Sequence, residues 1–140
     1  MKDASLIIHT DGGSRGNPGA AACAFVAEKD GQVIFKDSRS LGKNTNNFAE
    51  YKGIILALEW LNRNKDKFSN NTIEFFADSE LIVKQLNGIY KIKNSQLTVL
   101  NKIAQQLIVQ IKLKILFKNI PRNENKIADF LVNEELDKET

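Results

Sequence analysis

The sequence has little of several residue types that define other classes of protein. It contains one cysteine, Cys23, and one histidine, His9. An internal disulfide is therefore excluded, and Cys23, within a run of alanines, is predicted to be a small buried residue rather than a nucleophile. No apolar run is long enough to cross a bilayer, and the first residues do not resemble a signal peptide. These features predict a cytoplasmic protein with no membrane association.

Acidic residues are missing from one long stretch. Between Leu81 and Asn123 there is no Asp or Glu, although the formal net charge of the whole chain is only +3. The charge is therefore polarised, and such a basic segment suits a polyanion that is held by its phosphates. The basic residues in this stretch are Lys84, Lys91, Lys93, Lys102, Lys112, Lys114, Lys118 and Arg122. The first three are favoured as phosphate contacts, because Lys112, Lys114 and Lys118 alternate with apolar residues as in a sheet-edge strand kept soluble by lysine.

Four carboxylates stand at places where a solvated surface charge is not the simplest explanation. Asp11 ends an apolar run and precedes Gly12-Gly13, and Asp78 ends a second strand-like run. Glu50 lies beside the apolar stripe of a predicted helix, and Asp129 stands between apolar residues. A lone aspartate of this kind is often a helix cap or a surface charge. Four of them, with no histidine or cysteine cluster, predict a site for hard divalent cations that take oxygen ligands.

The order of predicted elements indicates a mixed α/β fold. With 140 residues, 42% of them hydrophobic, the chain is expected to form a single domain, 1–140. Periodicity and turn residues predict three strands, a helix, a strand, two helices, a strand and a last helix. The predicted bounds are Leu6–Thr10, Ala20–Glu28, Gln32–Phe35, a helix capped by Asn46 or Asn47 and ending near Asn64, Ile73–Ala77, Ser79–Asn87, Gln96–Leu107, a strand through Phe117, and Asn125–Leu136.

Four blocks of sequence together resemble the type 1 ribonuclease H family. They are 10–19 (TDGGSRGNPG), 45–50 (TNNFAE), Asp78-Ser79 and 125–129 (NKIAD), and they occur in the order typical of that family. The resemblance extends from Leu6 to Leu136. It implies a five-stranded mixed sheet, three antiparallel strands followed by two parallel ones, with helices on both faces. It also implies that Asp11, Glu50, Asp78 and Asp129 are catalytic and metal-binding.

The implied activity is cleavage of the RNA strand of an RNA·DNA hybrid. A phosphodiester is shielded by negative charge, so in-line attack by water benefits from two Mg²⁺ ions about 4 Å apart, one near the water and one near the leaving oxygen. Mn²⁺ is a possible substitute. The products would carry 5′-phosphate and 3′-hydroxyl ends, and the enzyme is expected to act as a monomer.

Substrate recognition must come from other residues, because metal ions do not distinguish RNA from DNA. The 2′-hydroxyl of RNA can be recognised by backbone groups and polar side chains in the minor groove. The residues expected to do so are Gly12, Gly13, Ser14, Asn17, Asn46 and Asn47. By resemblance, Thr45 and Asn94 would hold a phosphate of the DNA strand. Turn chemistry alone would also explain Asn17, and helix capping would explain Asn47.

The sequence departs from many members of the family in two ways. The segment from Lys91 to Gln96 is too short for the basic protrusion with which many bacterial members grip the hybrid. The loop before Asp129 has no histidine, and Arg122 stands there instead, where it is expected to contact a phosphate or the product. His9 is expected to be a strand residue with its polar atoms satisfied, rather than a group that binds metal or transfers protons. Two alternatives stay open: a related nuclease that also cuts double-stranded RNA or RNA–DNA junctions, and a module that binds nucleic acid without cutting it.

Overall fold

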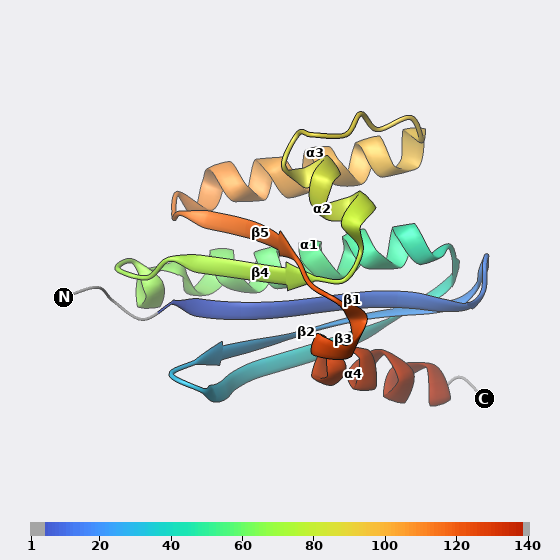
Figure 1. The fold of residues 1–140 in the computed structure, drawn as a ribbon, viewed down its shortest axis with the longest axis horizontal. Helices are drawn as coiled ribbons and strands as arrows, with labels where there is room; N and C mark the ends of the chain where they lie inside the picture. The colour runs from blue at the N-terminus through green and yellow to red at the C-terminus, as the bar shows by residue number, and fades with distance from the viewer. Residues whose placement is uncertain (1–4, 139–140) are drawn as a thin grey trace.

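The computed structural model describes residues 5–138, so residues 1–4 and 139–140 of the predicted domain lie outside the described part. A five-stranded sheet and four α-helices make up the fold (Figure 1). The strands are β1 (Leu6–Gly16), β2 (Gly19–Lys29), β3 (Gln32–Asn44), β4 (Ile73–Ala77) and β5 (Ile115–Asn119). The helices are α1 (Asn46–Asn64), α2 (Glu80–Leu86), α3 (Ser95–Ile111) and α4 (Lys126–Asp137), with short 3₁₀ turns η1 (Lys65–Phe68) and η2 (Arg122–Glu124).

The sheet is mixed, as predicted. Its strand order is β3-β2-β1-β4-β5. β1 pairs antiparallel with β2, and β2 with β3, whereas β4 lies parallel to both β1 and β5. β1 is therefore the central strand, and the carboxyl end of β4 lies beside it, which is where sheets of this kind place their ligands.

Alternate residues of β2 face two different helix layers. Cys23, Phe25 and Ala27 belong to the large core beneath α1 and α3. Ala22 and Ala24 belong to a smaller cluster with α4. Because successive residues of a strand point to opposite faces, α1 and α4 cover opposite sides of the sheet. The predicted arrangement of helices on both faces is confirmed.

Cys23 is the small buried residue that the sequence predicted. It is 1% exposed within the core beneath α1. Burial raises the pKa of its thiol to about 12, so the nucleophilic thiolate is disfavoured at neutral pH.

Several predicted bounds were too short. β1 does not end near Asp11 but continues to Gly16, because residues 11–16 keep pairing with the small residues at the start of β2. β3 likewise extends from Phe35 to Asn44 along β2. The alternating lysine pattern was misleading, since Lys112 is the left-handed cap of α3 and β5 begins only at Ile115. No helix within residues 5–138 combines the length and the apolarity needed to cross a membrane.

The predicted cap of the first helix was also wrong. The Thr45 side chain, rather than Asn46 or Asn47, accepts the hydrogen bond from the Phe48 amide, at 3.2 Å. The side-chain oxygen of Asn46 instead accepts hydrogen bonds from the Ser14 amide at 2.8 Å and the Ser14 hydroxyl at 3.1 Å. The start of α1 is thereby joined to the far end of β1.

Candidate active site

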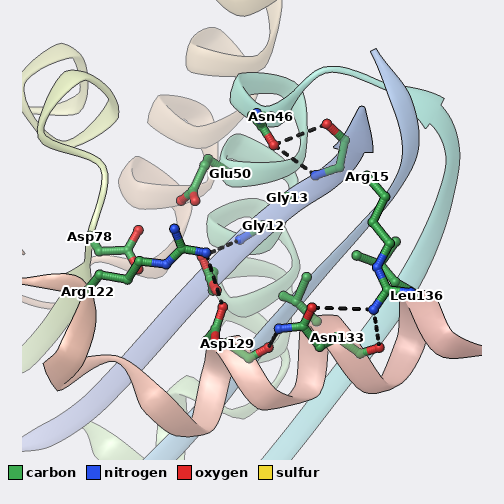
Figure 2. A pocket seen from close by; sticks show the side chains of 13 residues that line it. Gly12, Gly13, Arg15, Asn46, Glu50, Asp78, Arg122, Asp129, Asn133 and Leu136 are labelled. Carbon is green, nitrogen blue, oxygen red and sulfur yellow. Dashed lines mark hydrogen bonds and ion pairs between the residues drawn. The ribbon is translucent and has the colours of Figure 1, made fainter. Parts of the chain in front are cut away.

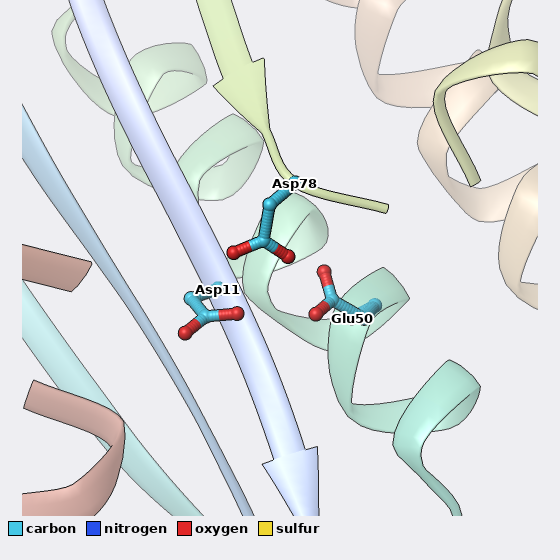
Figure 3. A group of neighbouring side chains, drawn as sticks. All are labelled: Asp11, Glu50 and Asp78. Carbon is cyan, nitrogen blue, oxygen red and sulfur yellow. The ribbon is translucent and has the colours of Figure 1, made fainter. Parts of the chain in front are cut away.

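Three of the four predicted carboxylates meet at the end of β4. Asp11 comes from the middle of β1, Glu50 from the first turns of α1, and Asp78 follows β4 directly. One oxygen from each side chain can be chosen so that all three lie within 4.8 Å of one another. Figure 3 shows the three carboxyl groups turned toward a common point. Residues far apart in the sequence thus form one acidic group.

Two glycines allow α1 to lie close enough to β1 for this contact. A β-carbon added at Gly12 would lie 2.2 Å from the carbonyl carbon of Ala49 and 2.5 Å from the Glu50 nitrogen. A β-carbon at Gly53 would lie 2.7 Å from the carbonyl oxygen of Asp11. The backbones of helix and strand are therefore in direct contact on both sides of Glu50, and this contact holds its carboxylate beside Asp11.

Hydrogen bonds fix two of the carboxylates. The Gly12 amide donates to Asp11 Oδ1 at 2.9 Å. The buried side chain of Asn125 donates to the Thr10 carbonyl oxygen at 2.8 Å and to Asp78 Oδ2 at 3.3 Å. The sequence analysis gave Asn125 no role of its own, although it begins the 125–129 block.

Burial makes the group electrostatically unfavourable without a cation. Asp11 and Glu50 are 6% and 7% exposed. Burial, followed by repulsion from Asp78, raises the pKa of Asp11 to about 7. Burial and the neighbouring Asp11 charge raise the pKa of Glu50 well above its ordinary value. Glu50 Oε2 is also buried with no hydrogen-bond partner among the described residues. Hard oxygen ligands that repel one another and include an unpaired buried oxygen fit a divalent cation.

Asp129 lies at the same pocket but outside the close group. It is in the first turn of α4 and half-buried, and Arg122 Nη2 lies 3.8 Å from its Oδ1. Of the apolar residues around it, Ala128 and Leu131 are buried, whereas Ile127 and Phe130 are 47% and 63% exposed. The helix turns those two side chains outward and Asp129 inward. Asp129 is thus more exposed than Asp11 and Glu50.

The pocket around these residues has a volume of about 360 Å³ (Figure 2). Among the predicted substrate residues, Gly12, Gly13, Ser14, Asn46 and Arg122 line it. Asn17 lies just behind, where its side-chain oxygen accepts a hydrogen bond from the Asn46 amide at 3.0 Å. Further lining residues that the sequence analysis did not identify are Arg15, Val132, Asn133 and Leu136. The last three follow Asp129 at helical spacings of three, four and seven, a pattern that would have revealed them.

Two of the remaining predicted contacts lie at a second hollow. Asn47 and Asn94 line it together with Tyr90, Lys91 and Lys93, and its volume is about 510 Å³. The Asn94 side chain also caps α3 by accepting a hydrogen bond from the Leu97 amide at 3.0 Å. Thr45 is occupied as the cap of α1 and lines neither hollow.

Lys84, which the sequence favoured as a phosphate contact, is less available than Lys91 and Lys93. Its ammonium group pairs with Glu80 at 2.8 Å and lies 3.4 Å from the Tyr90 hydroxyl. His9 is a strand residue, as expected, but it is held by stacking on Phe76 with ring centroids 5.3 Å apart. Its Nδ1 is buried with no hydrogen-bond partner among the described residues, so the expectation that its polar atoms are satisfied was wrong, and burial lowers its pKa.

Comparison with known proteins shows which family this chain resembles. A family model described as "Reverse transcriptase-like" matches residues 9–135. A bifunctional protein of Mycobacterium tuberculosis is 37% identical over 134 residues, which cover 94% of this chain and 35% of that protein. Ribonuclease HI of Halobacterium salinarum is 37% identical over 128 residues, covering 91% of this chain and 62% of its own length. The chain thus spans about a third of the mycobacterial relative.

Solved structures agree with the sequence matches. LC11-RNase H1, crystallised in complex with an RNA/DNA hybrid, superposes with a TM-score of 0.91 at 40% identity, covering 96% of this chain and 99% of that one. RNase H1 from Halobacterium salinarum gives a TM-score of 0.87 at 35% identity, covering 96% and 98%. The chain therefore belongs to the reverse-transcriptase-like family and, within it, to type 1 ribonuclease H.

Proposed function

We propose that the protein is an endoribonuclease that hydrolyses the RNA strand of RNA·DNA hybrids and leaves 5′-phosphate and 3′-hydroxyl ends. The observation that carries this proposal is the set of three carboxylates within 4.8 Å in a chain of the type 1 ribonuclease H family. A surface that only bound nucleic acid would gain nothing from buried negative charge opposite phosphates. The carboxylates therefore argue for catalysis.

Asp11, Glu50, Asp78 and Asp129 are proposed to hold two Mg²⁺ ions, with Mn²⁺ as a possible substitute. When bound, such ions supply positive charge to the attacking and leaving oxygens of a phosphodiester. The chain contributes geometry: the Gly12 amide orients Asp11 and the Asn125 amide orients Asp78. Asp129, at the open side of the group, is proposed to complete it when substrate is present.

The RNA strand is proposed to lie along Gly12, Gly13 and Ser14. The oxygen of the Asn46 amide is already used by Ser14, and its nitrogen has no hydrogen-bond partner among residues 5–138. This nitrogen is therefore free to donate to a 2′-hydroxyl, as is the side-chain nitrogen of Asn17, whose oxygen accepts from Asn46. Arg122 is proposed to contact a phosphate or the product from the opposite wall of the pocket.

The DNA strand is proposed to lie at the second hollow. Lys91 and Lys93 are exposed there and form no ion pair with another described residue. Asn47, Asn94 and Thr45 offer polar groups nearby, with Thr45 and Asn94 proposed to hold one phosphate of this strand. Together these residues form a short basic surface beside the acidic pocket. The enzyme is proposed to act as a monomer. A cytoplasmic location is also proposed, and the presence of a single cysteine supports it.

The deciding experiment compares cleavage of labelled RNA·DNA, RNA·RNA, DNA·DNA and single-stranded RNA with Mg²⁺, Mn²⁺ or EDTA. Asp11→Asn serves as the control for a contaminating nuclease and should lose at least about a hundredfold in rate, since the metal site supplies several kcal/mol. Cutting of RNA only in the hybrid, dependent on metal and on Asp11, would support the proposal. Additional cutting of RNA·RNA would widen the substrate range, and tight hybrid binding without cutting would make the chain a binding module.

A further inference from the structure

The largest of the described hollows is far from the carboxylates. It has a volume of about 710 Å³ and lies between the start of β3, the end of β2 and the last turn of α1 with η1. Glu50 and Arg63 stand at opposite ends of α1, about 20 Å apart along the helix axis. Figure 1 shows the β2–β3 turn at the end of the molecule away from the end of β4 and the start of α4. The substrate roles proposed above leave this hollow unused.

The floor of this hollow is aromatic. Phe35 stacks on Trp60 with centroids 5.4 Å apart and planes 12° apart, and Phe68 packs against Trp60 in a tilted arrangement with centroids 5.6 Å apart. Trp60 and Phe68 are buried, whereas Phe35 and Ile34 are 40% and 45% exposed. Ile34 is the extra residue of a β-bulge, since Ala27 pairs with Phe35 and Glu28 with Val33. Three adjacent apolar side chains, Val33, Ile34 and Phe35, are exposed at this edge of the sheet, and the last two line the hollow.

The rim of the hollow is positively charged. Lys29, Arg63 and Lys67 line it, and no Asp or Glu is among the lining residues. None of the three forms an ion pair with a carboxylate of another described residue. Lys29 instead lies over the Phe68 ring at 5.9 Å from its centroid. Cationic side chains at a sheet edge normally prevent self-association. Here they surround an aromatic hollow, and a second copy of this chain, with the same cations, would be repelled from it.

We infer that this hollow, lined by Lys29, Ile34, Phe35, Trp60, Arg63, Lys67 and Phe68, binds an acidic peptide segment of a partner protein that carries bulky apolar side chains. An apolar side chain of the peptide packs on Ile34, Phe35 and the edge of Trp60. Its carboxylates pair with Arg63 and Lys67. Nucleic acid fits less well, because phosphates would meet the cations but leave the exposed apolar floor uncovered. The inference stands independently of the proposed nuclease activity.

The test begins with displayed nine-residue peptides built from Asp, Glu, Leu, Ile and Phe. A matched library replaces Asp and Glu by Lys and Arg. Peptides selected on the purified protein are then synthesised and titrated. Trp60 is the chain's one tryptophan, so its fluorescence reports binding at the hollow directly when the peptides lack tryptophan. The acidic library should yield binders that change this fluorescence, and the basic library should not.

Two variants locate the binding. Arg63→Glu with Lys67→Glu should weaken a selected peptide at least tenfold, and Ile34→Ser should weaken it severalfold. Lys102→Glu with Lys114→Glu, an equal charge change at exposed lysines elsewhere, should have little effect. Cleavage of RNA·DNA should be unchanged in the Arg63, Lys67 and Ile34 variants, and circular dichroism checks that each variant is folded.

Several results would overturn the inference. They are an acidic library without binders, binders insensitive to Arg63 and Lys67, or a Trp60 response to basic peptides of equal strength. Quenching of Trp60 by an RNA·DNA hybrid that Arg63→Glu abolishes would make the hollow a nucleic-acid surface instead. Concentration-dependent dimerisation lost on Ile34→Ser would make it a self-association surface.

Discussion

The side chain of Asn125 positions Asp78: its amide nitrogen donates hydrogen bonds to Asp78 Oδ2 at 3.3 Å and to the Thr10 carbonyl oxygen at 2.8 Å. One side chain from the start of α4 therefore connects the middle of β1 with the residue that follows β4. Asn125 is 1% exposed, so its bond to Thr10 is shielded from bulk water, and its bond to the half-buried Asp78 is partly shielded.

Replacing Asn125 by alanine should affect both stability and catalysis. Loss of a buried donor that satisfies two acceptors is expected to lower the free energy of unfolding by about 2 kcal/mol. Because Asp78 loses its orientation, the Mg²⁺ concentration for half-maximal cleavage should rise. Urea denaturation and a metal titration of the rate measure the two effects. An unchanged metal requirement would show that Asp78 does not depend on Asn125.

Replacing Arg122, which lines the same pocket, should affect substrate binding but not stability. Its side chain is 83% exposed and its ion pair with Asp129 is long, so Arg122→Ala should change stability by less than about 0.5 kcal/mol. The proposed phosphate contact should nevertheless raise KM severalfold, and Arg122→Lys should recover part of the loss. Steady-state kinetics on a labelled hybrid separate KM from kcat. Equal kinetics in Arg122→Ala and the wild type would remove Arg122 from the substrate contacts.

The raised pKa of Asp11, about 7, predicts how the metal-free protein responds to pH. Between the ordinary value of 3.8 and about 7 the folded state binds more protons than the unfolded state, so stability falls as pH rises through this window. The raised pKa of Glu50 acts in the same direction. Thermal melts in EDTA should therefore show a lower Tm at pH 8 than at pH 5.

Asp11→Asn provides the control for this pH effect. The amide carries no charge, so the variant should melt at a higher temperature than the wild type at pH 8 in EDTA, and its Tm should depend less on pH. Mg²⁺ should raise the Tm of the wild type more than that of the variant. A steeper pH dependence in Asp11→Asn would contradict the repulsion among these carboxylates.

The glycine pair beside Asp11 allows a matched test of the contact between α1 and β1. Gly12→Ala would place a methyl group 2.2 Å from backbone atoms of Ala49, and this overpacking should cost about 3 kcal/mol of stability. At Gly13, the next residue of the same strand, the nearest atom to an added methyl group is 3.8 Å away. Gly13→Ala should therefore be far milder by chemical denaturation. Similar costs at both positions would show that α1 shifts freely.

The sequence identified the carboxylates better than it identified their surroundings. Asp11 and Asp78 were recognisable because each follows a short apolar strand, which is a local signal. The extension of β1 to Gly16 was not, because polar and glycine residues become a strand there only by pairing with β2. The role of Asn125 was not predicted for a similar reason, because its partners Thr10 and Asp78 are distant in sequence.

The predicted substrate residues show a further limit. They were proposed as one set, but the structure divides most of them between the acidic pocket and the hollow beside α3. Thr45, rather than Asn46 or Asn47, caps α1, because the side-chain oxygen of Asn46 instead accepts hydrogen bonds from Ser14 of β1. Such competition between nearby polar groups is decided by tertiary geometry, which a single sequence does not display.

The two helix layers differ in the size of their apolar cores, and this difference predicts which layer unfolds first. α4 is held by a small cluster of Ala22, Ala24, Leu131, Val132 and Leu136, whereas α1 and α3 share the large core on the other face. Asp129 and the Asn125 support of Asp78 belong to the weaker layer. On heating, the proposed cleavage activity should therefore be lost by release of α4 while the sheet and its main core remain folded.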